Sequence, residues 1–335
     1  MLSPDAVPGV AADLVRAVRG KRSQAAFSRR IGYSANIAHR WESGACWPTA
    51  AVFLEICARL RPEREQAFVR FLKRAPSWLD PDAPFSDASV AAFLRELQGK
   101  TPIGALAERS GYSRFSVSRW LRGRARPKLP EFLCLVEAAS RRGLDFIAQL
   151  VDPAQMVTIS ASWIKLERAR RAAHEVPWSH AVMRALELAA YQRRAGRSER
   201  WLAAELGVDI DEVRSGLAAL ESSGQIRKTR GTWRIDRVIT VDTRLDPVAG
   251  TKLKAAWTQV ALERLQRNAP GHYGYSLFAI SRNDLRRLRE LHLQYVRAMQ
   301  NLVADSTPAE CVGLYCAQLI HLSARDNVLD EPSSS

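Results

Sequence analysis

The sequence predicts a mainly α-helical protein with two tandem helix-turn-helix domains, followed by a winged-helix domain and a small α+β C-terminal domain. Three observations predict this fold class. A segment of 29 residues is repeated, apolar residues recur at helical spacing along most of the chain, and residues 225–235 alternate as a short β-hairpin does. The expected domains span residues 8–75, 86–152, 160–240 and 250–325.

Composition narrows the class of protein. Apolar residues make up 47% and charged residues 25% of the 335 residues, as in ordinary globular proteins. No apolar run approaches the roughly 20 residues that cross a bilayer, and the N-terminus lacks the pattern of a signal peptide. We therefore expect a cytoplasmic protein with no membrane partner.

The five cysteines form no CxxC pair and no zinc-binding cluster with histidine. Cys57 and Cys134 lie in apolar helical patterns, and Cys311 and Cys316 lie in an apolar run near the C-terminus. Because a free cysteine behaves as a small apolar residue, we expect buried, reduced thiols. No metal and no other cofactor is predicted.

The net charge of +15 is unevenly distributed along the chain. Residues 1–152 carry 24 basic and 15 acidic side chains (+9), residues 153–244 carry 16 and 11 (+5), and residues 245–335 carry 10 and 9 (+1). A strongly basic N-terminal half is typical of a region that binds a polyanion such as nucleic acid, although an anionic membrane surface also attracts cations.

The first domain has the start and stop signals of short helices. Ser23 and Ser34 can cap a second and a third helix, Gly20 ends the first, and Gly32 allows the left-handed turn between the second and third. Apolar residues at helical spacing are expected to form the core: Leu14, Val15, Val18, Ala26, Phe27, Ile31, Ala38 and Trp41.

The segment SQAAFSRRIGYSANIAHRWESG, residues 23–44, resembles the helix-turn-helix of lambda repressor/Cro-type (XRE-like) transcriptional regulators. The residues that match the family pattern are Ser23, Gln24, Phe27, Gly32, Trp41, Glu42, Gly44 and Pro48. In that family the third helix lies in the major groove, and the Gln that begins the second helix contacts a phosphate. The resemblance therefore implies a DNA-binding regulator.

A similar segment occurs a second time in the sequence. Positions 20–48 and 99–127 align without a gap and share 11 of 29 residues, which indicates an internal duplication. An apolar helix is expected after each copy, at residues 50–60 and 129–140, so that each copy could close its own core.

The resemblance assigns the reading surface of copy one to the start of its third helix, and a phosphate contact to the Gln of its second helix. Asparagine suits a two-bond contact with adenine, and arginine suits one with guanine. The candidate residues of copy one are Gln24, Ser34, Ala35, Asn36, His39 and Arg40.

Copy two differs at the phosphate contact. Ile103 replaces Gln24, and Thr101 is expected to cap the second helix, with Pro102 at its first position. The third helix and the loop after it are basic and contain no acid, so they could read bases and bind phosphates; the alternative is a solvated basic face. The candidate residues of copy two are Ser113, Arg114, Phe115, Ser118, Arg119, Arg122, Arg124 and Arg126.

Prolines at 76, 81 and 84 interrupt the chain between the two copies. An extended linker of a dozen residues spans roughly 40 Å, which would place the two heads in successive major grooves about 34 Å apart.

A third helix-turn-helix is expected in the winged-helix domain, where Trp201, Leu202, Leu206, Val213, Leu217 and Leu220 are helically spaced. Its recognition helix would begin with Asp209, Asp211 and Glu212, which suit a helix N-terminus but would face phosphates. We expect a structural or dimer-forming role, with DNA contact by the basic wing residues Arg227, Lys228, Arg230 and Arg234 as the alternative.

Beyond residue 250 the sequence predicts two helices, at residues 251–266 and 283–303, a short apolar segment at 276–281, and a buried strand at 310–323. This order of segments after a repressor-type head resembles a group of little-characterised bacterial regulators, which usually have a single head. We expect this half to form a homodimer and to sense an effector of unknown kind.

No catalytic motif is found: the chain has no Gly-rich phosphate loop, no HExxH and no GxSxG, and its six histidines are scattered. We therefore predict that the protein is not an enzyme but a sequence-specific transcription regulator that binds double-stranded DNA in the bacterial nucleoid. Two alternatives remain: an architectural or partition-type DNA-binding protein, and a protein-interaction scaffold whose heads no longer bind DNA.

Overall fold

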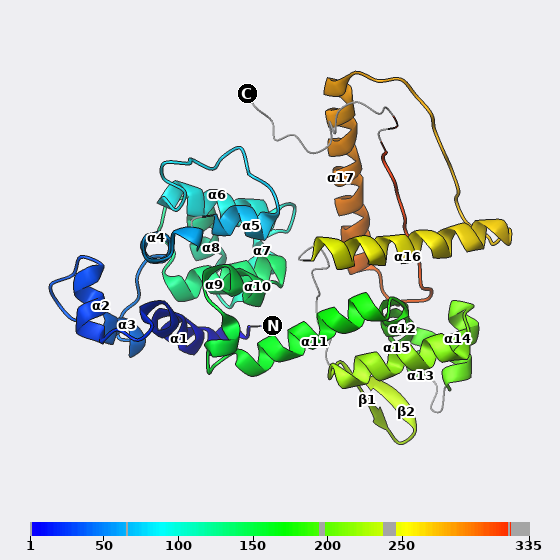
Figure 1. Ribbon diagram of the computed structural model, residues 1–335, viewed down its shortest axis with the longest axis horizontal. Coiled ribbons are helices and arrows are strands. Elements are labelled where there is room, and N and C mark those ends of the chain that lie inside the picture. The colour runs from blue at the N-terminus through cyan, green and yellow to red at the C-terminus, as the bar shows by residue number, and fades with distance from the viewer. Residues whose placement is uncertain (1, 65, 194–197, 237–245, 321, 323–335) are drawn as a thin grey trace. The chain divides into compact units, whose positions relative to one another are not determined.

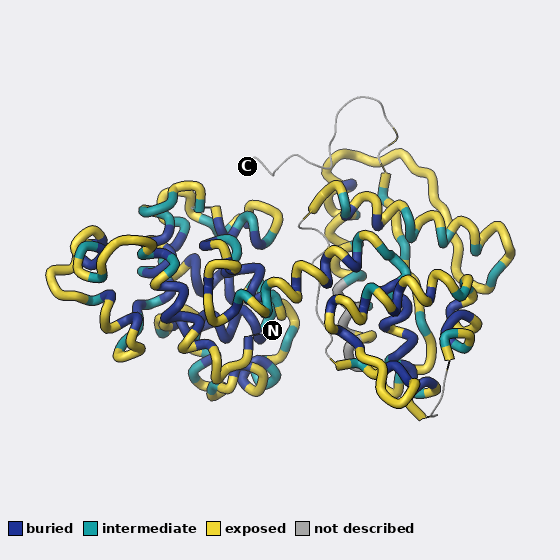
Figure 2. The backbone as a smooth tube through the Cα atoms, turned by 60° about the horizontal axis from the view of Figure 1, so that its bottom comes forward, coloured by how far each residue is buried: buried dark blue, intermediate teal, exposed yellow. Residues whose placement is uncertain are grey.

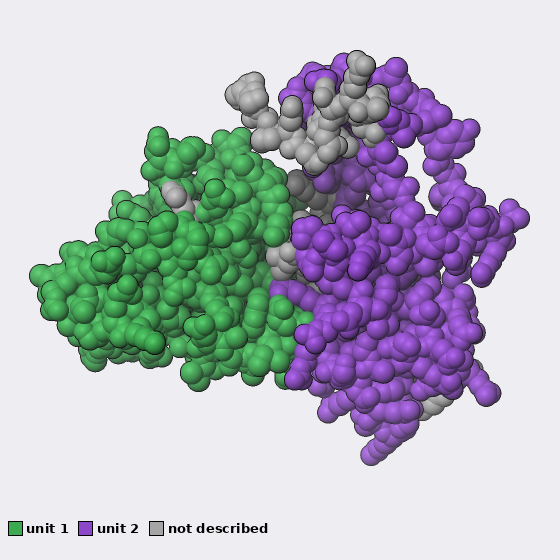
Figure 3. Space-filling view, viewed as in Figure 1, with its two compact units in different colours: residues 1–167 green, residues 168–335 purple. Residues whose placement is uncertain are grey.

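The computed structural model describes residues 2–64, 66–193, 198–236, 246–320 and 322. These residues are mainly helical, with 63% helix and 3% strand, which confirms the mainly α fold with a small α+β part (Figure 1). The chain divides into two compact units, residues 1–167 and residues 168–335 (Figure 3). None of the described helices is long and apolar enough to cross a membrane.

Unit 1 contains the same run of helices twice. Copy one consists of α1 (Val7–Arg19), α2 (Gln24–Arg30), α3 (Ile37–Glu42), α4 (Ala50–Leu60) and α5 (Ala67–Leu72), with short 3-10 helices at Pro4–Ala6 and Pro62–Arg64. Copy two consists of α6 (Asp87–Gln98), α7 (Ile103–Ser110), α8 (Arg114–Leu121), α9 (Leu129–Ser140) and α10 (Gly143–Leu150), followed by a 3-10 turn at Pro153–Gln155.

The two copies share one core. The helix α1 packs against α9 of copy two, α4 packs against α6, and α5 packs against α10. Aromatic rings from both copies meet between these helices: Phe68 stacks on Phe93 with ring centroids 4.2 Å apart, and Phe71 meets Phe146 edge to face at 5.5 Å. The expectation that each copy closes its own core is therefore wrong, because helices of copy one pack against helices of copy two. Figure 2 shows the buried residues of this unit in dark blue.

The segment between the copies folds onto this core. Phe85 is buried, with its ring centroid 5.1 Å from that of Phe68, and the indole N–H of Trp78 donates to Glu96 at 2.7 Å. The segment is therefore not the extended spacer that its prolines suggested. Its aromatic side chains gain more by burial than an exposed linker would.

A single antiparallel bridge joins Thr49 to Lys128, which occupy equivalent positions in the repeat. Two backbone hydrogen bonds, of 2.9 and 3.0 Å, also connect equivalent positions: Ala50 N–H to the Pro127 carbonyl, and Leu129 N–H to the Pro48 carbonyl. Copy one donates one of these bonds to copy two, and copy two donates the equivalent bond to copy one. At this point the two copies are therefore related by a local two-fold axis.

Unit 2 begins within α11 (Ser160–Glu175) and contains α12 (Trp178–Glu187), α13 (Ala189–Arg193), α14 (Glu199–Leu206) and α15 (Ile210–Ser222). The strands β1 (Ile226–Thr229) and β2 (Thr232–Ile235) pair antiparallel to form the expected hairpin. Gly207, with φ of 60°, provides the left-handed turn between α14 and α15, so that α14, α15 and the hairpin have the arrangement of a winged helix.

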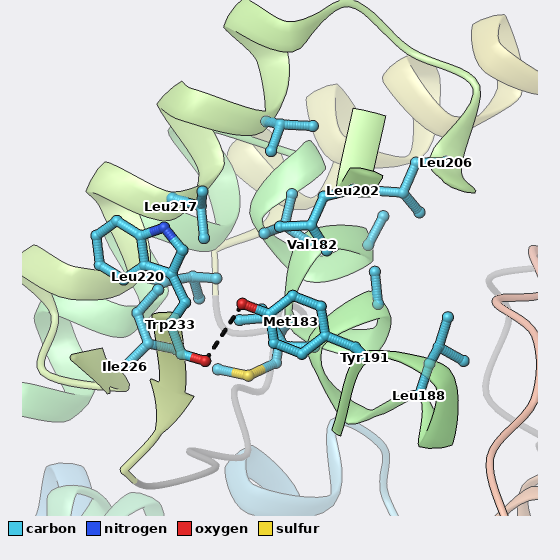
Figure 4. Packing of buried hydrophobic residues seen from close by; sticks show 14 of the residues in the cluster. Val182, Met183, Leu188, Tyr191, Leu202, Leu206, Leu217, Leu220, Ile226 and Trp233 are labelled. Carbon is cyan, nitrogen blue, oxygen red and sulfur yellow. Dashed lines mark hydrogen bonds between the residues drawn. The ribbon is translucent and has the colours of Figure 1, made fainter. Parts of the chain in front are cut away.

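The core of the winged helix is the one that the apolar spacing predicted. Leu202, Leu206, Leu217 and Leu220 are buried with Val182, Met183 and Tyr191 (Figure 4). Val213 is buried with them, and Trp201 packs partly buried against this cluster. The Tyr191 hydroxyl donates to the Trp233 carbonyl at 3.3 Å, which ties the helices to β2.

The C-terminal part contains the two expected helices, α16 (Pro247–Gln266) and α17 (Arg282–Asp305). The buried strand expected at residues 310–323 is not formed in its described part: residues 310–320 run as extended chain (Figure 1), pair with no strand among the described residues, and are mostly exposed. His321 and residues 323–335 lie outside the described residues. Residues 276–280 are likewise extended and exposed.

Candidate nucleic-acid interface

Copy one forms its helix-turn-helix through buried and capping hydroxyls. The Ser23 hydroxyl accepts from the Ala26 N–H at 3.2 Å and caps α2. Ser28, which is buried, donates to the Gln24 carbonyl at 2.8 Å and accepts from the Ala38 N–H at 3.1 Å. Because Ser28 bonds both helices, it fixes the start of α3 against α2.

The third helix of copy one begins later than predicted. Ser34 makes no cap; instead the Asn36 side chain accepts from the His39 N–H at 3.4 Å, and α3 starts at Ile37. Ser34, Ala35 and Asn36 are therefore exposed residues of the turn that precedes the helix, while His39 and Arg40 are exposed on its first turns. Asn36 uses its carbonyl oxygen in the cap and retains its amide group for other contacts.

The predicted phosphate contact, Gln24, has an internal partner. Its side-chain amide donates to the Glu42 carboxylate at 2.8 Å, and Arg19 donates to the same carboxylate at 2.6 Å. Arg16 adds an ion pair at 3.7 Å. Glu42 is nearly fully buried, so these donors hold a charge that would otherwise be costly to bury.

In copy two, all three residues of this polar cluster are different. Gln24, Glu42 and Arg19 correspond to Ile103, Leu121 and Gln98. The backbone contact remains: Arg16 donates to the Glu42 carbonyl at 2.9 Å, and the equivalent Arg95 donates to the Leu121 carbonyl at 2.8 Å. The loss of Gln in copy two is therefore accompanied by the loss of its carboxylate partner. Sequence reasoning missed this cluster, although the paired differences between the copies were visible in the repeat.

The Tyr and Trp that both copies of the repeat share pack against each other in each copy. Tyr33 meets Trp41 edge to face at 5.7 Å, and Tyr112 meets Trp120 at 5.2 Å. Both tryptophans are buried. These shared residues therefore hold the turn against the third helix, and the differences between the copies lie in the exposed residues around them.

The helix α8 presents an aromatic ring and cations in its first turns. The Ser113 hydroxyl accepts from the Ser116 N–H at 3.1 Å and caps the helix. Phe115 is 70% exposed, and the Arg119 guanidinium lies 5.4 Å from its ring centroid. The Arg114 guanidinium lies over Gly104 of α7, where a side chain would collide with it. Ser118 is half-buried beside them.

The loop after α8 continues this basic surface. Arg122 ends the helix, and Arg122 and Arg124 are both exposed. Arg126 is exposed but forms an ion pair with Asp87 at 2.8 Å. The corresponding positions in copy one are Ser43, Ala45 and Trp47, so the extra positive charge belongs to copy two alone.

The start of α7 differs from the prediction. Pro102 occupies the cap position, no side chain caps the helix, and α7 begins at Ile103. Thr101 does not serve as the cap, because its hydroxyl accepts from no helix N–H among the described residues. Its carbonyl accepts from the Gln98 side chain at 3.0 Å.

The third helix-turn-helix, in unit 2, is acidic at its recognition helix. Asp209 caps α15 by accepting from the Asp211 N–H at 2.9 Å, and Asp211 and Glu212 follow in the first turn. On the wing, Arg227 pairs with Asp236 at 3.2 Å and Lys228 lies 3.8 Å from Glu199. This surface is less suited to phosphate than that of α8, because its acids lie where DNA would approach.

The cysteines are all free, and two of them lie in the core of unit 1 as predicted. Burial raises the pKa of Cys134 to about 11, and it raises the pKa of Cys57 as well, so both remain thiols at neutral pH. Cys311 is exposed and Cys316 is half-buried, which differs from the expectation of buried thiols.

Comparison with known proteins gives one assignment, in the second half of the chain. Residues 159–318 match the sequence model of a family described as a domain of unknown function (DUF4423). This region contains the winged helix, α16 and α17. No family of the helix-turn-helix or XRE type was found to match. No curated protein matches the chain. No solved structure matches it either.

Proposed function

We propose that the protein is a sequence-specific, double-stranded DNA-binding transcription regulator whose two heads in unit 1 contact DNA through α3 and α8. The observation that carries this proposal is the surface of α8 and its loop. Phe115, Arg119, Arg122 and Arg124 are exposed there without an acid in residues 113–128. Arginines next to an exposed ring on a helix-turn-helix suit phosphate and base contacts together.

The two heads have different reading surfaces, which predicts two unlike half-sites for one chain. Copy one offers Asn36, His39 and Arg40, a polar surface with little charge. Copy two offers Arg114, Phe115 and a run of arginines. Because the copies share one core, we expect them to bind as a unit and not as two independent heads. Selection of bound fragments from random DNA, with the full chain, reports the two half-sites and their spacing.

Substitutions separate base reading from phosphate contact. Arg40→Ala is expected to cost roughly 1–3 kcal/mol of operator affinity and to relax the preference at one base position. Arg122→Ala is expected to weaken binding to all sequences alike and to lower the salt slope by about one ion. Arg40 is a cleaner choice than Asn36, since Asn36→Ala also removes the α3 cap at a cost of about 1 kcal/mol.

Arg171→Ala is the matched control, because it removes an exposed arginine from unit 2. Affinity is measured by titration at several salt concentrations. An Arg40→Ala protein with unchanged affinity and base preference would contradict the role of α3. Broad protection of DNA without a defined operator would favour an architectural protein, and absence of binding at low salt would favour a scaffold. The proposal gives self-association and effector sensing to the C-terminal half.

A further inference from the structure

Two extended segments in unit 2, residues 271–280 and 310–320, lack the partners that extended chain needs. No backbone hydrogen bond joins either segment to another described residue. Backbone N–H and C=O groups in native proteins are nearly always paired, and an exposed strand edge is a template for another chain. We refer to residues 271–280 and 310–320 as the edge segments.

The edge segments are held in place although they are unpaired. Val312 packs partly buried against the winged-helix core, the Cys316 thiol lies 3.7 Å from the Trp257 carbonyl, and the Gln318 amide donates to Thr258 at 3.1 Å. Tyr315 meets Tyr295 of α17 at 5.6 Å. Residues 310–320 are therefore anchored to unit 2 by these four side chains, while most of their residues remain exposed.

The outward side chains are large and apolar. Tyr275 is 93% exposed and Leu277 is 78% exposed. With the rest of the edge segments, they expose on the order of 800 Å² of side-chain surface, about the share that one partner gives to a stable interface. The exposed large apolar residues of the edge segments are Tyr273, Tyr275, Leu277, Phe278, Ile280, Leu314, Tyr315 and Ile320.

Charge indicates what covers this surface. Residues 271–280 and 311–320 contain no Asp, Glu, Lys or Arg, and residues 245–335 as a whole carry 10 basic and 9 acidic side chains. The remainder of the chain carries +14, so two copies would repel each other at most other surfaces. An acidic protein or a nucleic acid would find no Lys or Arg on the edge segments, whereas a second copy brings another unpaired edge whose one charged residue is Glu310.

From these observations we infer that the edge segments pair with those of a second copy to form an intermolecular sheet, which makes the protein a two-fold symmetric homodimer. A two-fold axis satisfies the edges of both chains at once and leaves none open. The apolar residues would then form the interface core, where charged residues are depleted and aromatic residues are enriched. This inference gives a site to the self-association in the proposed function, but it does not depend on DNA binding.

The test measures the mass of the full chain by light scattering, without DNA. The wild-type protein is expected at twice the 37.4 kDa of one chain. Tyr275→Asp and, separately, Leu277→Asp are expected to reduce it to a single chain, because each buries a charge in the interface. Both side chains are largely exposed in one chain, so helical circular dichroism should persist. Val157→Asp is the control, since Val157 is 88% exposed in unit 1.

Hydrogen exchange tests the pairing itself. Amides of residues 271–280 and 310–320 are expected to be protected in the wild-type dimer and to exchange rapidly in the monomeric variants. A wild-type mass of one chain, a mass above two chains, or dimers that survive both substitutions would overturn the inference. So would a dimer whose edge-segment amides exchange as rapidly as those of the variants. Failure to bind DNA would affect only the proposed function.

Discussion

At the scale of single residues, Glu42 explains why Gln24 has a different neighbourhood from its counterpart Ile103. A carboxylate buried beneath a helix-turn-helix is tolerated only with donors, and Gln24, Arg19 and Arg16 supply them. Copy two has the apolar residues Ile103 and Leu121 at these two positions. The copies therefore use two different solutions, one polar and one apolar, at the same place in the fold.

This difference predicts a non-additive set of variants. Glu42→Leu alone is expected to destabilise the protein by about 2 kcal/mol, because Arg19 and Gln24 lose their partner while staying largely covered. Adding Gln24→Ile and Arg19→Gln installs the residues of copy two and should recover much of that loss. Urea unfolding of the full chain measures both. A triple variant less stable than Glu42→Leu would show that the two closures cannot be exchanged.

His180 in α12 gives unit 2 a pH dependence. Burial lowers the pKa of His180 below its ordinary 6.5, and the nearby Arg184 and His174 lower it further. Below pH 6.5, His180 is therefore protonated more readily in the unfolded chain than in the folded chain. The free energy of unfolding consequently falls as the pH drops below 6.5. We expect the wild-type Tm to fall more between pH 7.5 and 5.5 than that of His180→Gln. Equal slopes for the two proteins would mean that His180 titrates alike in both states.

At the scale of elements, capping and turn residues predicted most helices, because these residues lie next to the helix ends in the sequence. Ser23 and Gly32 act where the sequence predicts. The start of α3 was missed because Asn36, a strong cap two residues after Ser34, takes over the role. In copy two that position is Phe115, which cannot cap, and Ser113 keeps the role. Ser34, Ala35 and Asn36 therefore lie before α3, while Arg114, Phe115, Ser118 and Arg119 lie within α8.

Partners distant in sequence could not be predicted in the same way. The apolar run at residues 310–323 predicted a buried strand, but a strand also needs a neighbour, and residues 310–320 pair with none among the described residues. The aromatic residues of α5 likewise gave no indication that they would pack against copy two. Apolar periodicity predicts which face is buried and does not identify the element that covers it.

At the scale of the whole molecule, the shared core makes unit 1 one folding unit, although its sequence reads as two domains. The helix α1 packs against α9 of copy two. Phe68 and Phe71 of copy one pack against Phe93 and Phe146 of copy two. A fragment of residues 1–82 keeps every local helix signal of copy one but lacks these partners. Local signals alone rarely stabilise helices of 6 to 13 residues in water.

We therefore expect residues 1–82 to be largely unfolded by circular dichroism and to melt without a cooperative transition, whereas residues 1–167 should melt in a single transition. Mixing residues 1–82 with residues 83–167 should restore helical signal, because the two fragments together contain the whole aromatic cluster. Phe146→Ala in residues 1–167 tests the same coupling without cutting the chain. It should lower the stability of α1–α5 and α6–α10 together, as followed by hydrogen exchange in both copies. Cooperative melting of residues 1–82 alone, or exchange that changes only in copy two, would mean that the two copies fold independently.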